Sequence, residues 1–124
     1  MTKRILIIDD DEAVRFAFRL ALEDLPYQIN EAENGEIGSR LATTESVDAV
    51  FLDLRMPGIN GVEVLRRIRA SKPDLLIYIV TAFHREFLDQ LVSARGEGLA
   101  FELLRKPLDR QQIIEVVTSA VPSE

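Results

Sequence analysis

Short apolar runs alternate with segments of helical period along the whole chain, and this alternation restricts the folds that the chain can adopt. Five runs have the length of a β-strand: Ile5–Ile8, Tyr27–Ala32, Val47–Leu52, Leu75–Val80 and Leu99–Leu104. An apolar run without alternation is typical of a strand that is covered on both faces, as in a parallel sheet. Only Tyr27–Ala32 alternates, and this pattern predicts a strand with one side in water.

The segments between these runs carry apolar residues at helical spacing. We expect five helices, over residues 11–24, 35–42, 60–70, 85–94 and 109–120. Asp11 can cap the first of them. Pro57-Gly58, Lys72-Pro73 and Lys106-Pro107 separate the elements, because proline and glycine interrupt regular structure. Five β-α units in strict alternation predict an α/β fold with an open parallel sheet and helices on both faces.

Composition narrows the class of protein further. A length of 124 residues fits one domain, spanning 1–124. The chain has no cysteine, which excludes disulfides and thiolate metal sites. The first apolar run is too short for a signal peptide or a membrane span, so we expect a cytoplasmic protein without membrane contact. A net charge of −6 argues against direct nucleic-acid binding, which depends on neutralising phosphates.

Charged and hydroxyl residues follow the strands at the edge where a parallel sheet binds its ligands. They are Asp9, Asp10 and Asp11 after the first strand, Asp53 after the third, Thr81 after the fourth and Lys106 after the fifth. Carboxylates gathered in one pocket repel one another unless a cation neutralises them, and Mg²⁺ prefers oxygen ligands. An aspartate placed there can attack phosphorus and form an acyl phosphate. Each residue alone also fits a turn, a cap or a surface position; their combination favours the site.

The stretches that carry this chemistry resemble the receiver domain of two-component response regulators. They are Ile5–Asp11, Val50–Gly58, Asn60-Gly61, Ile79–Ala82 and Arg105–Pro107, in order along essentially the whole chain. The resemblance implies a flavodoxin-like, doubly wound (βα)5 fold, with a parallel five-stranded sheet in the order 2-1-3-4-5.

The resemblance also implies a role for each site residue. Asp53 would be the phosphoacceptor. Asp10 would bind Mg²⁺ or Mn²⁺ directly, Asp9 would reach the metal through water, and Asp53 and the backbone carbonyl of Arg55 would complete the site. Thr81 would donate its hydroxyl to the phosphoryl group and move on activation.

Two further positions follow from the same resemblance. Lys106 would pair with the phosphoryl group, and the Lys106–Pro107 peptide bond would be cis. Leu103 stands where the family carries an aromatic switch residue, with Phe101 two residues earlier. We therefore expect the output face on the fourth helix, fifth strand and fifth helix to be remodelled more weakly or differently than in relatives.

The neighbours of the phosphoacceptor bear on the lifetime of the acyl phosphate. Arg55 and Phe83, each two residues after a site residue, are bulky and predict slow self-dephosphorylation, because they crowd out the attacking water. Ala82 is small and leaves the entrance open to a donor. The single histidine, His84, is interpreted as solvated.

The resemblance implies a signalling module rather than an enzyme. A sensor histidine kinase or a histidine phosphotransfer protein would supply the phosphoryl group from a phosphohistidine, docking near Val14, Arg15 and Phe18, although Phe18 also fits the core. The modified chain would switch its binding to an effector protein or to a fused output domain. A dimer through the fourth helix, fifth strand and fifth helix is a further expectation.

Two other functions agree less well with these residues. One is a phosphohydrolase or phosphomutase of the haloacid-dehalogenase type, which forms an aspartyl-phosphate. Enzymes of this type carry an acidic residue two positions after the nucleophile, and here that position is Arg55. A pseudo-receiver that only binds protein is disfavoured because Asp9, Asp10, Asp53, Thr81 and Lys106 are all present. The chain has no glycine-rich phosphate loop, so nucleotide binding has no support.

Overall fold

The computed structural model describes residues 2–123 of the chain. Strands and helices alternate as β1 (Lys3–Ile8), α1 (Glu12–Leu22), β2 (Tyr27–Ala32), α2 (Gly35–Thr44), β3 (Ala49–Leu52), α3 (Gly61–Ser71), β4 (Leu76–Thr81), α4 (Leu88–Gly96), β5 (Glu102–Arg105) and α5 (Arg110–Ala120). All strand pairs are parallel, and the sheet order is β2-β1-β3-β4-β5. The predicted fold class and strand order are therefore confirmed.

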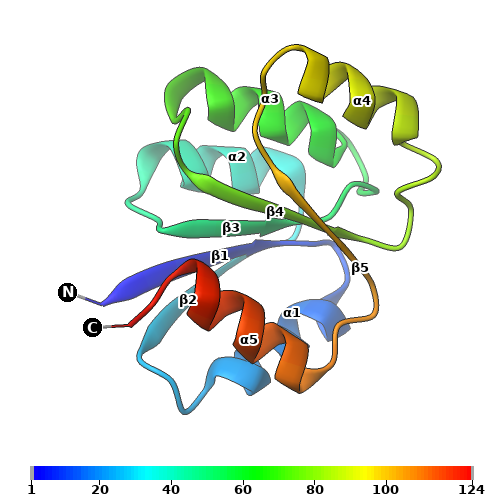
Figure 1. The fold of residues 1–124 in the computed structure, drawn as a ribbon. Helices are drawn as coiled ribbons and strands as arrows, with labels where there is room; N and C mark the ends of the chain where they lie inside the picture. The colour runs from blue at the N-terminus through cyan, green and yellow to red at the C-terminus, as the bar shows by residue number, and fades with distance from the viewer. Residues whose placement is uncertain (1, 124) are drawn as a thin grey trace.

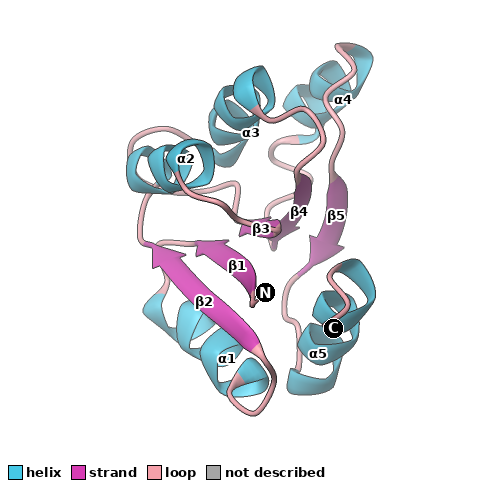
Figure 2. Cartoon of the chain, turned by 90° about the vertical axis from the view of Figure 1, so that its left-hand side faces the viewer, coloured by secondary structure: helices cyan, strands magenta, loops and turns pink. Residues whose placement is uncertain are grey.

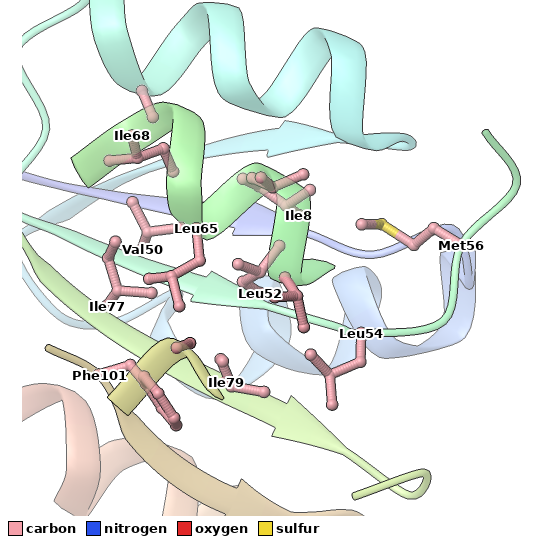
Figure 3. Close-up of a cluster of buried hydrophobic side chains, with 14 of the residues drawn as sticks. Ile8, Val50, Leu52, Leu54, Met56, Leu65, Ile68, Ile77, Ile79 and Phe101 are labelled. Carbon is pink, nitrogen blue, oxygen red and sulfur yellow. The ribbon is translucent and has the colours of Figure 1, made fainter. Parts of the chain in front are cut away.

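Helices cover both faces of the sheet, and this explains the apolar runs that do not alternate. Figures 1 and 2 show α2, α3 and α4 on one face and α1 and α5 on the other. In β1, Leu6 and Ile8 join the core beneath α2–α4, whereas Ile5 and Ile7 join the core beneath α1 and α5. Figure 3 shows how the side chains of β3, β4 and α3 fill the first of these cores. A strand between two such cores is apolar at consecutive positions wherever both of its faces are buried.

The helix starts follow local capping rules. The side chains of Asp11, Asn34, Asn60 and Asp109 accept hydrogen bonds from backbone N–H groups in the first turns of α1, α2, α3 and α5. Asp109 also forms a reciprocal capping box with Gln112. These bonds satisfy donors that have no partner inside a helix. The expected cap at Asp11 is confirmed.

Several boundaries differ from the sequence prediction, chiefly at β5. This strand begins at Glu102 rather than Leu99. The Leu99 N–H donates to the Ala94 carbonyl of α4 at 3.0 Å. Arginine side chains bind the carbonyls of the two residues before β5: Arg69 donates to that of Ala100 at 2.6 and 2.9 Å, and Arg95 to that of Phe101 at 2.7 Å. The prediction that this run is covered on both faces was wrong, since three of the four residues of β5 are exposed, among them Leu103 at 38%.

Other element boundaries are shifted as well. The helix α4 begins at Leu88 instead of Arg85, because residues 84–87 form turns. The strand β3 begins at Ala49 instead of Val47. Among residues 2–123, no helix combines the length and the apolar character that crossing a membrane would require.

The start of α3 packs directly against the backbone that follows β3. The N–H of Gly61 donates to the carbonyl of Leu54 at 2.8 Å. A Cβ atom at Gly61 would collide with the carbonyl oxygen of Asp53 and lie 2.8 Å from the Cα of Leu54. Only glycine permits this approach without moving the backbone that joins Asp53 to Leu54.

We therefore predict that Gly61→Ala lowers the free energy of unfolding by about 1–3 kcal/mol, the usual cost of overpacking. Gly96→Ala in α4 is the matched control. A Cβ there meets nothing within 4 Å, so alanine should be neutral or stabilise by roughly 0.5–1 kcal/mol. Urea denaturation of both variants tests the prediction, and equal stabilities would contradict it.

Candidate functional site

Three chemically important residues are placed by backbone hydrogen bonds that continue the parallel sheet past the ends of its strands. The N–H of Asp9 donates to the carbonyl of Ala32 at 3.1 Å, that of Asp53 to Ile8 at 2.9 Å, and that of Lys106 to Thr81 at 3.1 Å. Because each bond joins neighbouring strands, the three residues leave the sheet at the same edge.

Three carboxylates meet at this edge. Asp9, Asp10 and Asp53 each present one oxygen atom such that all three atoms lie within 4.8 Å of one another. Asp9 and Asp53 are buried, at 3% and 4% exposure, whereas Asp10 is exposed. They open into a cavity of about 690 Å³, whose lining residues are Asp9, Asp10, Asp11, Asp53, Arg55, Met56, Pro57, Phe83 and Lys106.

Lys106 supplies the positive charge inside this cluster. Its Nζ atom donates to Asp9 Oδ2 at 2.7 Å and lies 3.4 Å from Asp53 Oδ2. Burial raises the pKa of Asp9, and hydrogen bonds from Lys106 and from the Asp11 N–H lower it without cancelling the shift. Burial opposes the charge of Lys106, but the hydrogen bond to Asp9 and the charges of Asp9 and Asp53 outweigh burial and raise the pKa of Lys106.

The residues present fit a hard divalent cation. One lysine balances one of three carboxylates, so the cluster keeps an excess of negative charge when all three are ionised. The Asp10 carboxylate makes no hydrogen bond or ion pair with any residue in the range 2–123 and is accessible as a ligand. An all-oxygen donor set suits Mg²⁺ or Mn²⁺. The backbone carbonyl of Arg55 as a further ligand stays a prediction.

Two predicted site residues do not line the cavity. Thr81 ends β4, is fully buried, and its Oγ1 accepts a hydrogen bond from the Phe83 N–H at 3.0 Å. Leu103 lies in β5 opposite Ile79, with its side chain 38% exposed. The structure therefore brings together Asp9, Asp10, Asp53, Arg55 and Lys106 but leaves Thr81 and Leu103 outside. The peptide bond between Lys106 and Pro107 is cis.

A contact between two residues that line the cavity was not foreseen from the sequence. The guanidinium of Arg55 lies over the ring of Phe83, with Cζ 4.7 Å from the ring centroid. Both residues line the cavity, and they come from the loops that follow β3 and β4. The sequence showed that both residues are bulky and lie two places after a site residue, but no local pattern could show that their side chains stack.

Two other residues differ from their interpretation in the sequence. His84 is half-buried rather than solvated, and its Nδ1 atom is buried without a hydrogen-bond partner among residues 2–123. Arg15 is not a free docking group, because its side chain is 12% exposed and its Nη1 donates to the Asp9 carbonyl at 2.7 Å. Phe18, at 2% exposure, belongs to the core.

Comparison with known proteins agrees with this geometry. A family model described as the response regulator receiver domain matches residues 5–118. The response regulator MprA of Mycolicibacterium vanbaalenii is 35% identical over 114 residues, which cover 92% of this chain and 48% of MprA. Sporulation initiation phosphotransferase F of Bacillus subtilis is 30% identical over 122 residues, 98% of this chain and 96% of that protein. This chain thus spans about half of MprA and nearly all of the Bacillus protein.

A solved structure shares both the fold and a third of the sequence. The response regulator TrrA of Thermotoga maritima, determined in complex with Mg²⁺-BeF, superposes with a TM-score of 0.82 at 33% identity. The match covers 97% of this chain and 100% of TrrA. The matched family model, the sheet order and the acidic cluster at the sheet edge agree, and the chain belongs to the response regulator receiver domain family.

Proposed function

We propose that residues 1–124 form one receiver unit of a cytoplasmic two-component phosphorelay, in which Asp53 accepts a phosphoryl group from a phosphohistidine. The observation that carries this proposal is the placement of Asp53 beside Asp9, Asp10 and Lys106 on one open cavity. The chain would be a phosphoacceptor that assists its own modification, and not an enzyme with turnover of an external substrate. Arg55 occupies the place where a phosphohydrolase of this chemistry needs an acid.

The surroundings of Asp53 prepare it for in-line attack. Its Oδ1 atom accepts a hydrogen bond from the Leu54 N–H at 2.9 Å, which fixes the direction of the carboxylate. As the bond between a carboxylate oxygen and phosphorus forms, the bond from phosphorus to the donor histidine nitrogen breaks. That nitrogen keeps the electron pair and takes up a proton. Attack by a preoriented carboxylate needs little rearrangement of the protein.

Neutralisation of charge is the main demand on the other residues. Asp9, Asp10, Asp53 and the Arg55 carbonyl would hold Mg²⁺ or Mn²⁺. When bound, the cation neutralises the carboxylates and the charge that develops on the transferring phosphoryl group. Lys106 Nζ lies 3.4 Å from Oδ2 of Asp53, the residue that would carry the phosphoryl group. We assign Lys106 to a phosphoryl oxygen as a charge-assisted donor.

Readout of the modification would begin at Thr81. Its Oγ1 accepts a hydrogen bond from the Phe83 N–H, which leaves the hydroxyl proton unused in that bond. Because Thr81 is fully buried and outside the cavity, it would have to move toward Asp53 to donate that proton to a phosphoryl oxygen. Leu103 would respond in place of an aromatic ring. Exposed apolar side chains at Leu88, Val92 and Leu103 lie on α4 and β5, and this face, with α5, would bind an effector, a fused output domain or a second copy of the chain.

The donor would dock on α1 beside the cavity. A second, mostly apolar groove of about 240 Å³ adjoins Lys106, and its lining residues are Ala13, Val14, Ala17, Phe18, Val80, Lys106, Pro107, Leu108 and Ile113. We propose that an apolar side chain of the donor protein, from a sensor histidine kinase or a histidine phosphotransfer protein, enters this groove and brings its phosphohistidine to Asp53.

Labelling with a small phosphodonor tests the phosphoacceptor assignment. Wild-type protein should take up one phosphoryl group per chain with acetyl phosphate and Mg²⁺, and none after chelation. Asp53→Asn should take up none, because the nucleophilic oxygen is lost, whereas Asp24→Asn, which alters an exposed aspartate, should label normally. Intact-mass spectrometry gives the stoichiometry. Persistent labelling of Asp53→Asn, or continuous turnover of a phosphate ester by the wild type, would refute the proposal.

A charge in the apolar groove tests the docking site. Ala17→Glu should slow phosphoryl transfer from a phosphorylated histidine phosphotransfer protein by about tenfold or more, the effect of losing an apolar contact at the centre of an interface. Labelling by acetyl phosphate should not change, since that donor needs no docking. Val92→Glu on α4, at a 62% exposed position, is the control. Equal slowing with both donors would place the defect in the site instead of the groove.

The Arg55–Phe83 pair should prolong the life of the acyl phosphate by screening it from water. We expect Phe83→Glu and Arg55→Asn each to shorten the lifetime by about two- to fivefold, the rate equivalent of an exposed cation–π contact. Phe16→Glu is a matched control, because Phe16 is an exposed phenylalanine beneath another arginine, Arg19, on α1. Loss of label after donor removal gives the lifetimes, and unchanged values in both cavity variants would disprove the screening role.

A further inference from the structure

Arg15 of α1 reaches from the helix surface to the backbone of the acidic loop. It uses three different nitrogen atoms on three partners: Nη1 donates to the Asp9 carbonyl at 2.7 Å, Nε to Glu31 Oε1 at 3.1 Å, and Nη2 to Glu12 Oε2 at 2.5 Å. Its side chain is 12% exposed. Three hydrogen bonds from three nitrogen atoms hold the guanidinium in one position and orientation.

The carbonyl that Arg15 contacts belongs to the peptide unit that joins Asp9 to Asp10. The strand β1 ends at Ile8, so this carbonyl lies beyond the last paired residue of the strand. A carbonyl in partly buried surroundings needs a donor, and Arg15 provides it. Because a peptide unit is planar, holding its oxygen holds the orientation of the whole unit. The bond therefore sets the directions in which the Asp9 and Asp10 side chains leave the backbone.

Asp10 depends on this backbone constraint more than Asp9 does. The Asp9 carboxylate is also fixed by Lys106 and by the Asp11 N–H. The Asp10 carboxylate is exposed and has no side-chain partner within residues 2–123. Its approach to Asp9 and Asp53, with oxygen atoms within 4.8 Å, rests on the path of the main chain.

The position of the guanidinium is itself fixed from the neighbouring strand. Glu31 of β2 is 21% exposed and accepts hydrogen bonds from both Arg15 and Arg19. Arg19 also donates to Glu12 at 2.9 Å. Arg19 thus shares both acidic partners of Arg15 but makes no bond to the Asp9 carbonyl. A lysine ammonium could not span three partners in this fork geometry.

We propose that Arg15 is a positioning residue for phosphoryl transfer at Asp53: through the Asp9 carbonyl it holds the Asp9–Asp10 peptide so that both carboxylates face the divalent cation. This inference rests on the proposed function. It assigns to Arg15 a role outside the cavity, since Arg15 is not among the residues that line it. Groups that orient metal ligands typically affect metal affinity strongly even though they do not touch the metal.

Charge and geometry predict opposite effects of losing Arg15. Arg15 is a cation bound to the backbone of the acidic loop and disfavours a second cation there, so removing its charge alone should tighten Mg²⁺ binding. If Arg15 orients the ligands, removing it should weaken Mg²⁺ binding instead. The substitution Arg15→Lys separates the two effects, because it keeps the charge and loses the three-way contact.

The experiment measures the Mg²⁺ dissociation constant by isothermal titration calorimetry for the wild type, Arg15→Lys, Arg15→Gln and Arg19→Gln. We expect both Arg15 variants to bind Mg²⁺ about 10- to 100-fold more weakly, as for other second-sphere groups, with labelling by acetyl phosphate recovering at high Mg²⁺. Arg19→Gln should bind as the wild type does. Circular dichroism checks folding, and if Arg15→Gln does not fold, Arg15→Lys carries the test.

Unchanged or tighter Mg²⁺ binding by the folded Arg15 variants would overturn the inference, as would equal weakening in Arg19→Gln, which would indicate a general effect of the ionic network. The outcomes also separate this inference from the function on which it rests. Wild type that is labelled at Asp53 while the Arg15 variants bind Mg²⁺ normally refutes only the positioning role. Wild type that neither binds Mg²⁺ nor accepts label refutes both.

Discussion

The site depends on a parallel hydrogen-bond ladder that runs one residue beyond the ends of three strands. The bonds from Asp9 to Ala32, from Asp53 to Ile8 and from Lys106 to Thr81 join β1 to β2, β3 to β1 and β5 to β4. Parallel strands point the same way, so these bonds place side chains from distant parts of the sequence at one edge. The carboxylate cluster and its lysine follow from this register.

The carboxylate cluster differs from the rest of the buried interior, which is apolar. Both cores are apolar and well covered, whereas Asp9 and Asp53 are buried carboxylates with one lysine between them. Burial raises the pKa of Asp9 despite that lysine, so ionising Asp9 is less favourable than ionising an aspartate in water. Such conflicts with stability are expected at functional sites. A bound cation would relieve the repulsion between the carboxylates. Phosphoryl transfer would make use of the charged groups that are gathered there.

Surrounding elements differ in how firmly they hold the site. The loop with Asp9 and Asp10 is tied by Arg15 and by the Asp11 cap, and the residue after Asp53 is packed against Gly61. The face formed by α4 and β5 is different, because it exposes Leu88, Val92 and Leu103. The acidic centre is thus held by several contacts, whereas the apolar face on α4 and β5 is only partly covered.

The amino-acid pattern by itself determined the element order, the parallel sheet and the identity of Asp9, Asp10, Asp53 and Lys106 as neighbours. These features follow from local periodicity and from the rule that parallel strands end at one edge, which need no knowledge of side-chain contacts. The extent of β5, the stacking of Arg55 on Phe83, the burial of the Thr81 hydroxyl and the bond from Arg15 to the Asp9 carbonyl were decided only by the tertiary structure. Each depends on a long side chain or an edge strand meeting a partner from another element, and the periodicity of one segment carries no information about that partner.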